Sequence, residues 1–126
     1  MRKQYHHKKS TDGWLVWDVH KLAQRSKHLP VLEIPISGIG ALFENYWYQD
    51  DTDVPTCKWI TDHMQLVLEC DLDYPIILAA DGSVMDGMHR VCKAYLNGFS
   101  NLKAARFKVT PKPDLINPDP NDLSYD

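Results

Sequence analysis

A strand, a turn, a second strand and a helix follow one another in the middle of this chain, and this pattern most restricts its fold. Residues 74–80 (Tyr-Pro-Ile-Ile-Leu-Ala-Ala) are nearly all apolar, which is typical of a strand covered on both faces of a sheet. The Asp-Gly pair at 81–82 is a hairpin turn signal, and residues 83–85 return as a second strand. After the Asp-Gly pair at 86–87, apolar residues recur at helical spacing through residues 88–96. The pattern predicts a β-hairpin that leads directly into a helix.

The residues after this helix complete a strand–helix–strand unit. Gly98 lies where a left-handed C-terminal cap belongs. Within residues 104–109, Ala105, Phe107 and Val109 alternate with their neighbours, as a final strand should. The order of these elements predicts a right-handed parallel crossover.

The first half of the chain supplies an edge strand and further helices. Residues 31–36 alternate well enough for a strand, and a proline within them places this strand at a sheet edge. Asp18 can cap a short helix, and residues 37–42 can form one helical turn. Residues 56–69 form the best long helix, with Thr56 at its start. The apolar residues of this helix that fall on one stripe are Trp59, Ile60, Met64, Val67 and Leu68.

The 126 residues suit one domain, which we predict to be of the mixed α+β class, with a small mixed sheet and flanking helices. We expect an N-terminal arm at 1–13, a single domain at 14–110, and an extended C-terminal tail rich in Pro and Asp at 111–126. No apolar run approaches the roughly 20 residues of a membrane helix. We therefore expect no membrane partner. Three widely spaced cysteines suggest neither a disulfide framework nor a metal knuckle, so we expect a cytoplasmic location.

Charge is distributed unevenly along the chain. Residues 1–28 carry seven Lys or Arg and two Asp, a local charge of +5. Residues 42–82 carry nine acids and a single lysine, a local charge of −8. Residues 89–112 carry six Lys or Arg and no acid. This last basic stretch begins beside the 86–90 junction and suits a ligand that bears phosphate, although most such runs are solvated faces.

The junction at 86–90 is the main candidate site. A helix start offers unpaired N–H groups and the positive end of the helix dipole to an anion, and Gly87 would let a phosphate approach the backbone. Arg90 could bind phosphate through two hydrogen bonds, and His89 could donate a hydrogen bond or relay a proton. Asp86 could cap the helix, orient His89 or hold a metal beside a phosphate. Each residue also has an ordinary interpretation: a helix cap, an internal ion pair, or an exposed helix position.

The order of these segments resembles the N-terminal domain of ParB-like chromosome partition proteins over roughly residues 31–109. The shared features are an edge strand, a helix, a Pro-Ile strand, a hairpin, a Gly-x-x-Arg helix start, a helix that ends at Gly, and a last strand. The Gly-Met-His-Arg run is also similar to sulfiredoxin and to the free-serine kinases of that superfamily. The resemblance implies a ParB/sulfiredoxin-like fold in which this helix start binds nucleotide phosphates.

Carried over by residue, the resemblance makes Gly87, Met88, His89 and Arg90 the phosphate-binding positions. It also implies that one polar face of the 56–69 helix turns toward the nucleotide. The residues on that face are Lys58, Thr61 and Gln65.

The chain departs from these relatives in informative ways. Met88 stands where sulfiredoxin needs a reactive cysteine, and a thioether cannot act as a thiolate, so sulfiredoxin chemistry is not expected. No helix-turn-helix or dimerisation region follows before Asp126, so we do not expect a complete partition protein. A kinase of this superfamily needs a carboxylate base. The candidates for such a base are Glu69, Asp71 and Asp73.

Three functions follow, in this order of preference. The first is a nucleotide-binding NTPase or phosphotransferase that uses ATP or another NTP with Mg²⁺, with Asp86 and His89 as catalytic residues. The second is a non-catalytic module that binds a protein partner through the aromatic residues 46–48 and the acidic loop at 50–53. The third is nucleic-acid processing, supported only by the basic stretch.

Overall fold

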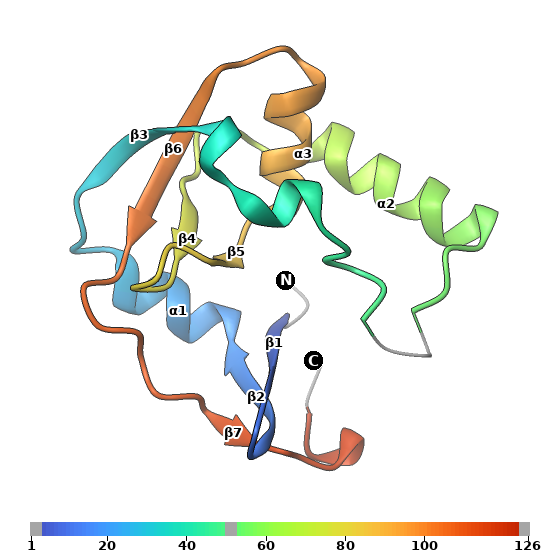
Figure 1. Cartoon of the computed structure of the whole chain (residues 1–126), viewed down its shortest axis with the longest axis vertical. Helices are drawn as coiled ribbons and strands as arrows, with labels where there is room; N and C mark the ends of the chain where they lie inside the picture. Colours follow the sequence, from blue (N-terminus) through green and yellow to red (C-terminus); the bar gives the residue numbers. More distant parts are fainter. Residues whose placement is uncertain (1–3, 50–52, 124–126) are drawn as a thin grey trace.

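The computed structural model describes residues 4–49 and 53–123 as a mixed α+β fold with two small sheets (Figure 1). In chain order its strands and α-helices are β1 (Tyr5–Ser10), β2 (Gly13–Asp18), α1 (Val19–Ser26), β3 (Val31–Pro35), α2 (Cys57–Glu69), β4 (Ile76–Leu78), β5 (Val84–Asp86), α3 (Met88–Leu96), β6 (Asn101–Arg106) and β7 (Leu115–Ile116). Short 3₁₀ turns occupy Ile36–Gly38, Gly40–Phe43 and Pro120–Asp122. The fold class predicted from the sequence is therefore confirmed. None of the helices in the described ranges is long and apolar enough to cross a membrane.

The larger sheet has the strand order β3-β6-β4-β5. The hairpin of β4 and β5 is antiparallel, and its turn is closed by hydrogen bonds between Ala79 and Ser83 and between Gly82 and Ala79. β4 and β6 are parallel, with β5 and α3 in the crossover between them, while β3 pairs only with β6 and lies at the edge. The hairpin and the edge strand agree with the sequence prediction, and so does the parallel pairing of the crossover, which joins β4 to β6.

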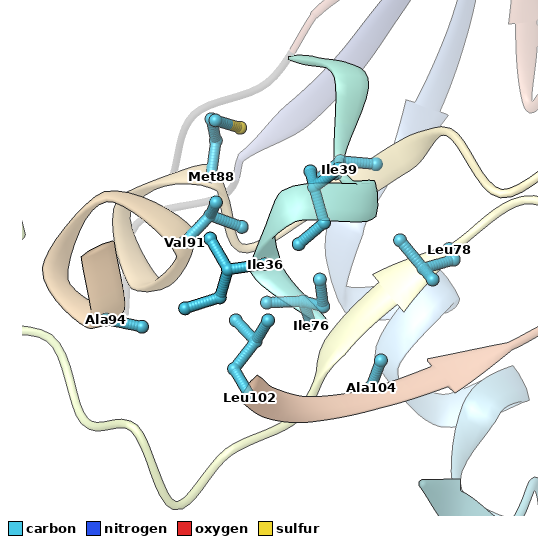
Figure 2. Packing of buried hydrophobic residues seen from close by; sticks show 10 residues of the cluster. Ile36, Ile39, Ile76, Leu78, Met88, Val91, Ala94, Leu102 and Ala104 are labelled. Carbon is cyan, nitrogen blue, oxygen red and sulfur yellow. The ribbon is translucent and has the colours of Figure 1, made fainter. Parts of the chain in front are cut away.

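β4 is buried on both faces, as its apolar sequence predicts. On one face, Ile76 and Leu78 belong to the cluster that α3 covers, and Figure 2 shows Val91 of that helix beside Ile36. On the other face, Ile77 packs in a second cluster of six buried residues, which are Trp17, Leu22, Ile77, Ala79, Met85 and Phe107. The strand therefore separates two hydrophobic clusters, and this fixes the position of the hairpin that leads to residue 86.

β6 differs from the predicted final strand at 104–109. It begins at Asn101 and ends at Arg106, and Val109 is exposed. Leu102 and Ala104 pack in the α3 cluster on one face, and Ala105 on the other face is also buried, so this strand too has side chains in the core on both faces. The ladder ends early because β4 ends at Leu78, and the chain beyond it turns so that Thr110 Oγ1 accepts from the Ala80 N–H (2.9 Å).

The arm expected at 1–13 is instead half of a β-hairpin over its described part. β1 pairs antiparallel with β2 from Tyr5↔Asp18 to Ser10↔Gly13. β1 was missed because its sequence, Tyr-His-His-Lys-Lys-Ser, is polar, so it carries no apolar alternation. Gly13 adopts a left-handed φ of +106° where the hairpin turns.

The tail expected at 111–126 also contributes a strand. β7 pairs antiparallel with β2, which makes β2 the middle strand of the smaller sheet. The Trp17 Nε1–H group donates to the Pro111 carbonyl oxygen (2.9 Å), and Asp114 Oδ2 accepts from the Asp18 N–H (2.8 Å). The expected tail is therefore held on the protein through much of its described length.

α2 forms where predicted, with Thr56 Oγ1 accepting from the Trp59 N–H (3.1 Å) as its N-terminal cap. None of its residues is fully buried, although an apolar stripe is typical of a helix that packs on a core. α2 lies beside α3 and extends away from both sheets (Figure 1). Lys93 of α3 holds its C-terminal end by donating to the carbonyl oxygens of Leu68 and Cys70.

Candidate functional site

The site begins where β5 ends at Asp86 and α3 starts at Met88. Gly87 between them has φ +104° and ψ 22°, a left-handed conformation that favours glycine. A Cβ at this position would lie 2.7 Å from Ile76 Cγ2 and 2.8 Å from Arg90 Nη2. The sequence singled out this glycine for close approach of a phosphate, whereas the structure gives it a packing role against β4 and Arg90.

Asp86 and Arg90 form an ion pair across the first turn of α3. Arg90 Nη2 lies 3.0 Å from Asp86 Oδ2 and 3.3 Å from the Pro75 carbonyl oxygen, and the two side chains are 19% and 21% exposed. Arg90 therefore ties the helix start to the residue before β4, which is the ordinary interpretation raised above. The expectation that Asp86 caps α3 is wrong, because Gly87 is the N-cap and no side chain caps the helix.

The first turn of α3 consequently has no side-chain acceptor for its N–H groups. The first helical bond in the described structure runs from the Val91 N–H to the Gly87 carbonyl oxygen (3.1 Å). N–H groups at an uncapped helix start attract acceptors, and the helix dipole favours an anionic one. The helix start is thus available to a ligand, provided that a ligand can reach it.

A cleft of about 720 Å³ reaches this helix start. Residues 85–89 line one side of it, and the β1–β2 hairpin and the segment around Tyr46 and Trp47 line the others. Among its described lining residues, none is Lys or Arg, whereas Asp53 and Asp86 are both present. The cleft is therefore rich in aromatic rings and offers an anion neutral donors, which are N–H groups, histidines, tyrosine hydroxyls and glutamine amides, rather than a Lys or Arg side chain.

Two histidines and two tryptophans form a cluster that joins α2 to this cleft. His63 Nδ1 lies 3.1 Å from His89 Nε2, so one ring donates and the other accepts. Trp47 stacks on His89 with 5.2 Å between ring centroids, and Trp59 stacks on His63 with 3.5 Å between centroids. Burial lowers the pKa of both histidines below the usual value, and each ring is favoured in its neutral form.

His63 was missed as a site residue by the sequence analysis. Trp59 and His63 are four residues apart on α2, so their shared face was visible in the sequence. Nothing in the sequence indicated that this face would meet His89, because the pairing of α2 with α3 is a tertiary contact.

Two further titratable groups line the cleft with strongly shifted pKa values. Burial, reinforced by the charges of His7 and Lys8, lowers the pKa of His6 to about 4. Burial and the nearby Asp86 carboxylate raise the pKa of Tyr46 to about 12. The cleft wall therefore holds a neutral imidazole and a neutral phenol at neutral pH.

The predicted polar face of α2 does not reach the cleft. Lys58 Nζ pairs with Asp62 Oδ2 (2.6 Å), and Gln65 Nε2 donates to Glu69 Oε1 (3.0 Å). Thr61 Oγ1 donates to the Cys57 carbonyl oxygen (2.7 Å).

These groups bond within their own helix, and none lines the cleft. The candidate bases are also absent from its described lining; they are Glu69, Asp71 and Asp73. The structure thus brings together Asp86, Gly87, Met88 and His89, with Arg90 directly behind them.

The basic stretch at 89–112 is partly used inside the protein. Arg90 binds Asp86, Lys93 binds two carbonyl oxygens of the α2 end, and Arg106 donates to the Ala80 carbonyl oxygen. Half of the six cations thus have internal acceptors, which weakens the only support for a nucleic-acid surface.

A metal site made by the protein alone is not supported. Within the described residues there is no group of three or more His, Cys, Asp or Glu side chains that could hold a metal ion. Asp86, the residue predicted for this role, is engaged by Arg90. Any magnesium at the cleft would therefore have to arrive with a phosphate ligand.

Comparison with known proteins adds no relative: no protein-family model matches this chain, and no curated protein or solved structure matches it. The geometry of the cleft and of the helix start therefore carries the functional argument.

Proposed function

We propose that this protein binds a nucleotide in the cleft, with a phosphate at the start of α3. The observation that carries the proposal is that an uncapped helix start opens on a cleft of about 720 Å³ with aromatic walls. Nucleotides combine a flat ring, which stacks on aromatic side chains, with a phosphate, which binds helix N-termini.

The phosphate would be held by the N–H groups of the first turn of α3. His89 is in that turn and lines the cleft, so its ring can add a hydrogen bond. Arg90 supports this arrangement from behind: its ion pair with Asp86 offsets a negative charge that would otherwise repel the ligand.

The base of the nucleotide would stack against the aromatic wall. Trp14, Tyr46 and Trp47 all line the cleft, and Trp47 is already held in place by stacking on His89. Stacking of a base on an aromatic side chain is worth about 1–3 kcal/mol and tolerates different bases. The geometry therefore favours nucleotides as a class rather than one particular base.

Binding is the core of the proposal, and catalysis remains a prediction. A neutral His89 can in principle accept a proton from a hydroxyl, but its Nε2 already faces His63. Asp86 is held by Arg90, and the other carboxylate in the described lining of the cleft is Asp53. ATP or another NTP with Mg²⁺ is retained as a ligand class, and hydrolysis or phosphoryl transfer depends on binding being found.

The relationship to the ParB/sulfiredoxin-like proteins is likewise a proposal. Its support is the order of elements from β3 through α2, β4, β5 and α3 to β6, which is the order that the resemblance implies. The β1–β2 hairpin and β7 lie outside that region and form a separate sheet.

The test is thermal melting of the full chain with AMP, ADP, ATP, GTP, CTP and UTP, each with and without magnesium. A ligand at about 100 times its Kd should stabilise by about 2.7 kcal/mol, which is a shift of several degrees for a domain of this size. We expect His89→Glu to abolish the shift, because a carboxylate in the first turn repels phosphate, and His89→Gln to retain most of it.

Gln24→Glu on α1 is the matched control, since it adds the same charge at an exposed position outside the cleft. Arg90→Ala is a poor probe, because it breaks an internal ion pair as well as any ligand contact. The absence of a shift with every nucleotide at millimolar concentration would overturn the proposal. A full shift in His89→Glu would show that the phosphate does not bind at the start of α3.

A protein-binding function is the second candidate, and a separate observation favours it. The apolar face of α2 is largely exposed, whereas the aromatic residues 46–48 are partly used in packing against α2 and His89. The acidic loop at 50–53 falls outside the described residues except for Asp53. The surface that supports a protein partner is therefore α2.

A further inference from the structure

α2 is attached to the rest of the protein by few contacts. None of its residues is fully buried, whereas the neighbouring α3 buries three side chains in the core. Among the described residues, two sets of polar side-chain contacts join these helices. Lys93 of α3 donates to two carbonyl oxygens at the end of α2, and His63 of α2 hydrogen-bonds to His89 of α3. An element with so little buried surface opens more easily than the core.

The contact between the two histidines lies at the centre of the ring cluster. His63 Nδ1 lies 3.1 Å from His89 Nε2. The His63 ring stacks on Trp59 of its own helix and also contacts Trp47, with 5.3 Å between those centroids. Rotation of the His63 ring away from His89 would lose both ring contacts. A force that separates the two histidines therefore acts on the position of α2.

The hydrogen bond between the histidines depends on their protons. When both rings are neutral, one facing nitrogen donates and the other accepts. One added proton preserves the bond, because an imidazolium still donates to a neutral ring. A second added proton makes both facing nitrogens donors and places two positive charges 5.2 Å apart between ring centroids. The doubly protonated pair therefore has no hydrogen bond and repels itself.

The charges that act on His63 come from its own helix and from the segment before it. Burial lowers the pKa of His63, whereas Asp53 and Asp62 act in the opposite direction. Asp62 is bound to Lys58 (2.6 Å), so part of its charge is already offset. The two acids therefore do not compensate for the loss of solvent around the ring.

The charges that act on His89 come from α2, β5 and α3. Burial lowers the pKa of His89, and the positive charges of a protonated His63 and of Arg90 lower it further. Asp86 opposes them, but it is bound to Arg90 (3.0 Å). Tyr46, which belongs to the segment packed beside the cluster, stays neutral in acid because its pKa is about 12.

The sign of the pH dependence follows from these directions. Both pKa values lie below the ordinary 6.5, so the docked arrangement binds fewer protons than an arrangement with the rings apart. Docking is therefore fully favoured above pH 6.5 and weakens as the pH falls through the two lowered values.

We propose that the His63–His89 pair makes the docking of α2 sensitive to pH: it holds α2 against α3 at neutral pH and releases it when both rings are protonated. α2 is the element that moves, because α3 is anchored in the core by its buried side chains. A helix of 13 residues is only marginally stable alone, so the released α2 also loses helical structure. The proposal concerns the attachment of α2 and does not depend on nucleotide binding in the cleft.

Hydrogen exchange of the full chain at pH 7 and pH 4.5, corrected for intrinsic rates, measures the release. In the wild type, peptides that cover 57–69 should lose protection by about tenfold or more at pH 4.5, while peptides that cover 101–106 remain protected. Because His6 also gains protons in this range, the decisive comparison is between variants.

Two variants keep the hydrogen bond but remove a titrating ring. His63→Asn should keep 57–69 protected at pH 4.5, because its amide can take the place of Nδ1 and gains no proton. His89→Gln should do the same, because its amide can take the place of Nε2. His28→Asn is the matched control: His28 is exposed and lies outside the cluster, so this variant should show the full wild-type loss.

Titration of the histidine rings by NMR provides the second measurement. In the wild type, the two rings should titrate in two coupled steps, with the second well below pH 6.5. In His89→Gln, His63 should take up its proton in one step at a higher pH than that second step, because the positive neighbour is absent. Independent single-step titration of both rings in the wild type would contradict the coupling.

Three exchange results overturn the proposal. The first is equal protection of 57–69 at both pH values in the wild type. The second is a loss in His63→Asn as large as that of the wild type. The third is a simultaneous loss of protection in 101–106, which would show that acid unfolds the whole protein rather than releasing α2.

Discussion

Gly87 has a structural role that does not depend on any ligand. Its left-handed conformation turns the chain from β5 into α3, and its lack of a side chain lets Ile76 and Arg90 approach the same point. The ion pair between Arg90 and Asp86 then closes the turn. The segment at 86–90, which the sequence indicated as a phosphate site, is thus also a packing motif. Its sequence alone does not distinguish the phosphate role from the packing role.

Substitution of this glycine tests the packing role. Gly87→Ala should destabilise the protein by about 2–4 kcal/mol, because it combines backbone strain with a clash against Ile76. Gly98→Ala is the control, since Gly98 also has a positive φ (+77°) but has no atom within 4 Å of the added Cβ. It should cost about 1 kcal/mol from strain alone. Equal losses in urea unfolding would contradict the packing role.

His6 makes the stability of the protein dependent on pH. Its pKa is 6.5 when unfolded and about 4 when folded, so between these values the unfolded state binds more protons. Stability is therefore retained above pH 6.5 and lost as the pH falls toward 4. From pH 7 to pH 5 this residue should contribute a loss of about 2 kcal/mol.

Urea unfolding at pH 7 and pH 5 measures this effect. His6→Phe keeps a ring beside Trp17 but removes the titrating group, so its stability should fall less over this range. Part of the dependence should persist, because the pKa values of His63 and His89 are lowered in the same direction. A variant with the full wild-type loss would show that His6 is not responsible.

At the scale of elements, the sequence predicted those strands, turns and helix ends that are determined by residues close together in the chain. The apolar run of β4, the Asp-Gly turn, the Thr56 cap of α2 and the Gly98 end of α3 each carry their own signal, and each is confirmed. β1 carries no such signal, since its pairing with β2 supplies its stability.

The candidate site was predicted only in part for the same reason. Residues 86–90 are contiguous in sequence, so their common position was visible. Their companions in the cleft come from β1, β2 and the segment around Trp47, which only the tertiary fold brings near. The apolar stripe of α2 is visible in the sequence, but its exposure is not, because an apolar helical face gives the same pattern whether it is covered or open to solvent.

Substitution of Asp114 tests how firmly the C-terminal segment is attached to the rest of the protein. Its Oδ2 accepts from the buried Asp18 N–H, and its Oδ1 lies 3.4 Å from Arg25 Nη2 and 3.8 Å from Lys21 Nζ. Asp114→Ala should cost about 1–3 kcal/mol, because a buried N–H group loses its acceptor.

Asp119→Ala, in the same segment but exposed, should cost less than about 0.5 kcal/mol. Thermal or urea unfolding of the two variants gives the comparison. Equal stability of both variants would mean that the segment around β7 contributes little to the fold.

At the scale of the whole molecule, the two sheets are completed in the same way. In each, a strand from late in the chain completes pairing that was begun much earlier: β7 joins β2, and β6 joins β3. The cleft lies between elements of both sheets, since β1 and β2 line one side and the end of β5 lines another. Formation of the cleft therefore requires the smaller sheet to be in place.

The central position of β6 sets the order of events during synthesis on the ribosome. β3 and β4 both pair with β6, so β3 has no neighbour and β4 has only β5 until residues 101–106 have left the exit tunnel. Until then, the nascent chain holds an unpaired strand and an isolated hairpin whose apolar residues have no cover, the state most prone to aggregation. The sheet can close only by inserting its last strand between two older ones, so this exposure lasts until β6 has emerged.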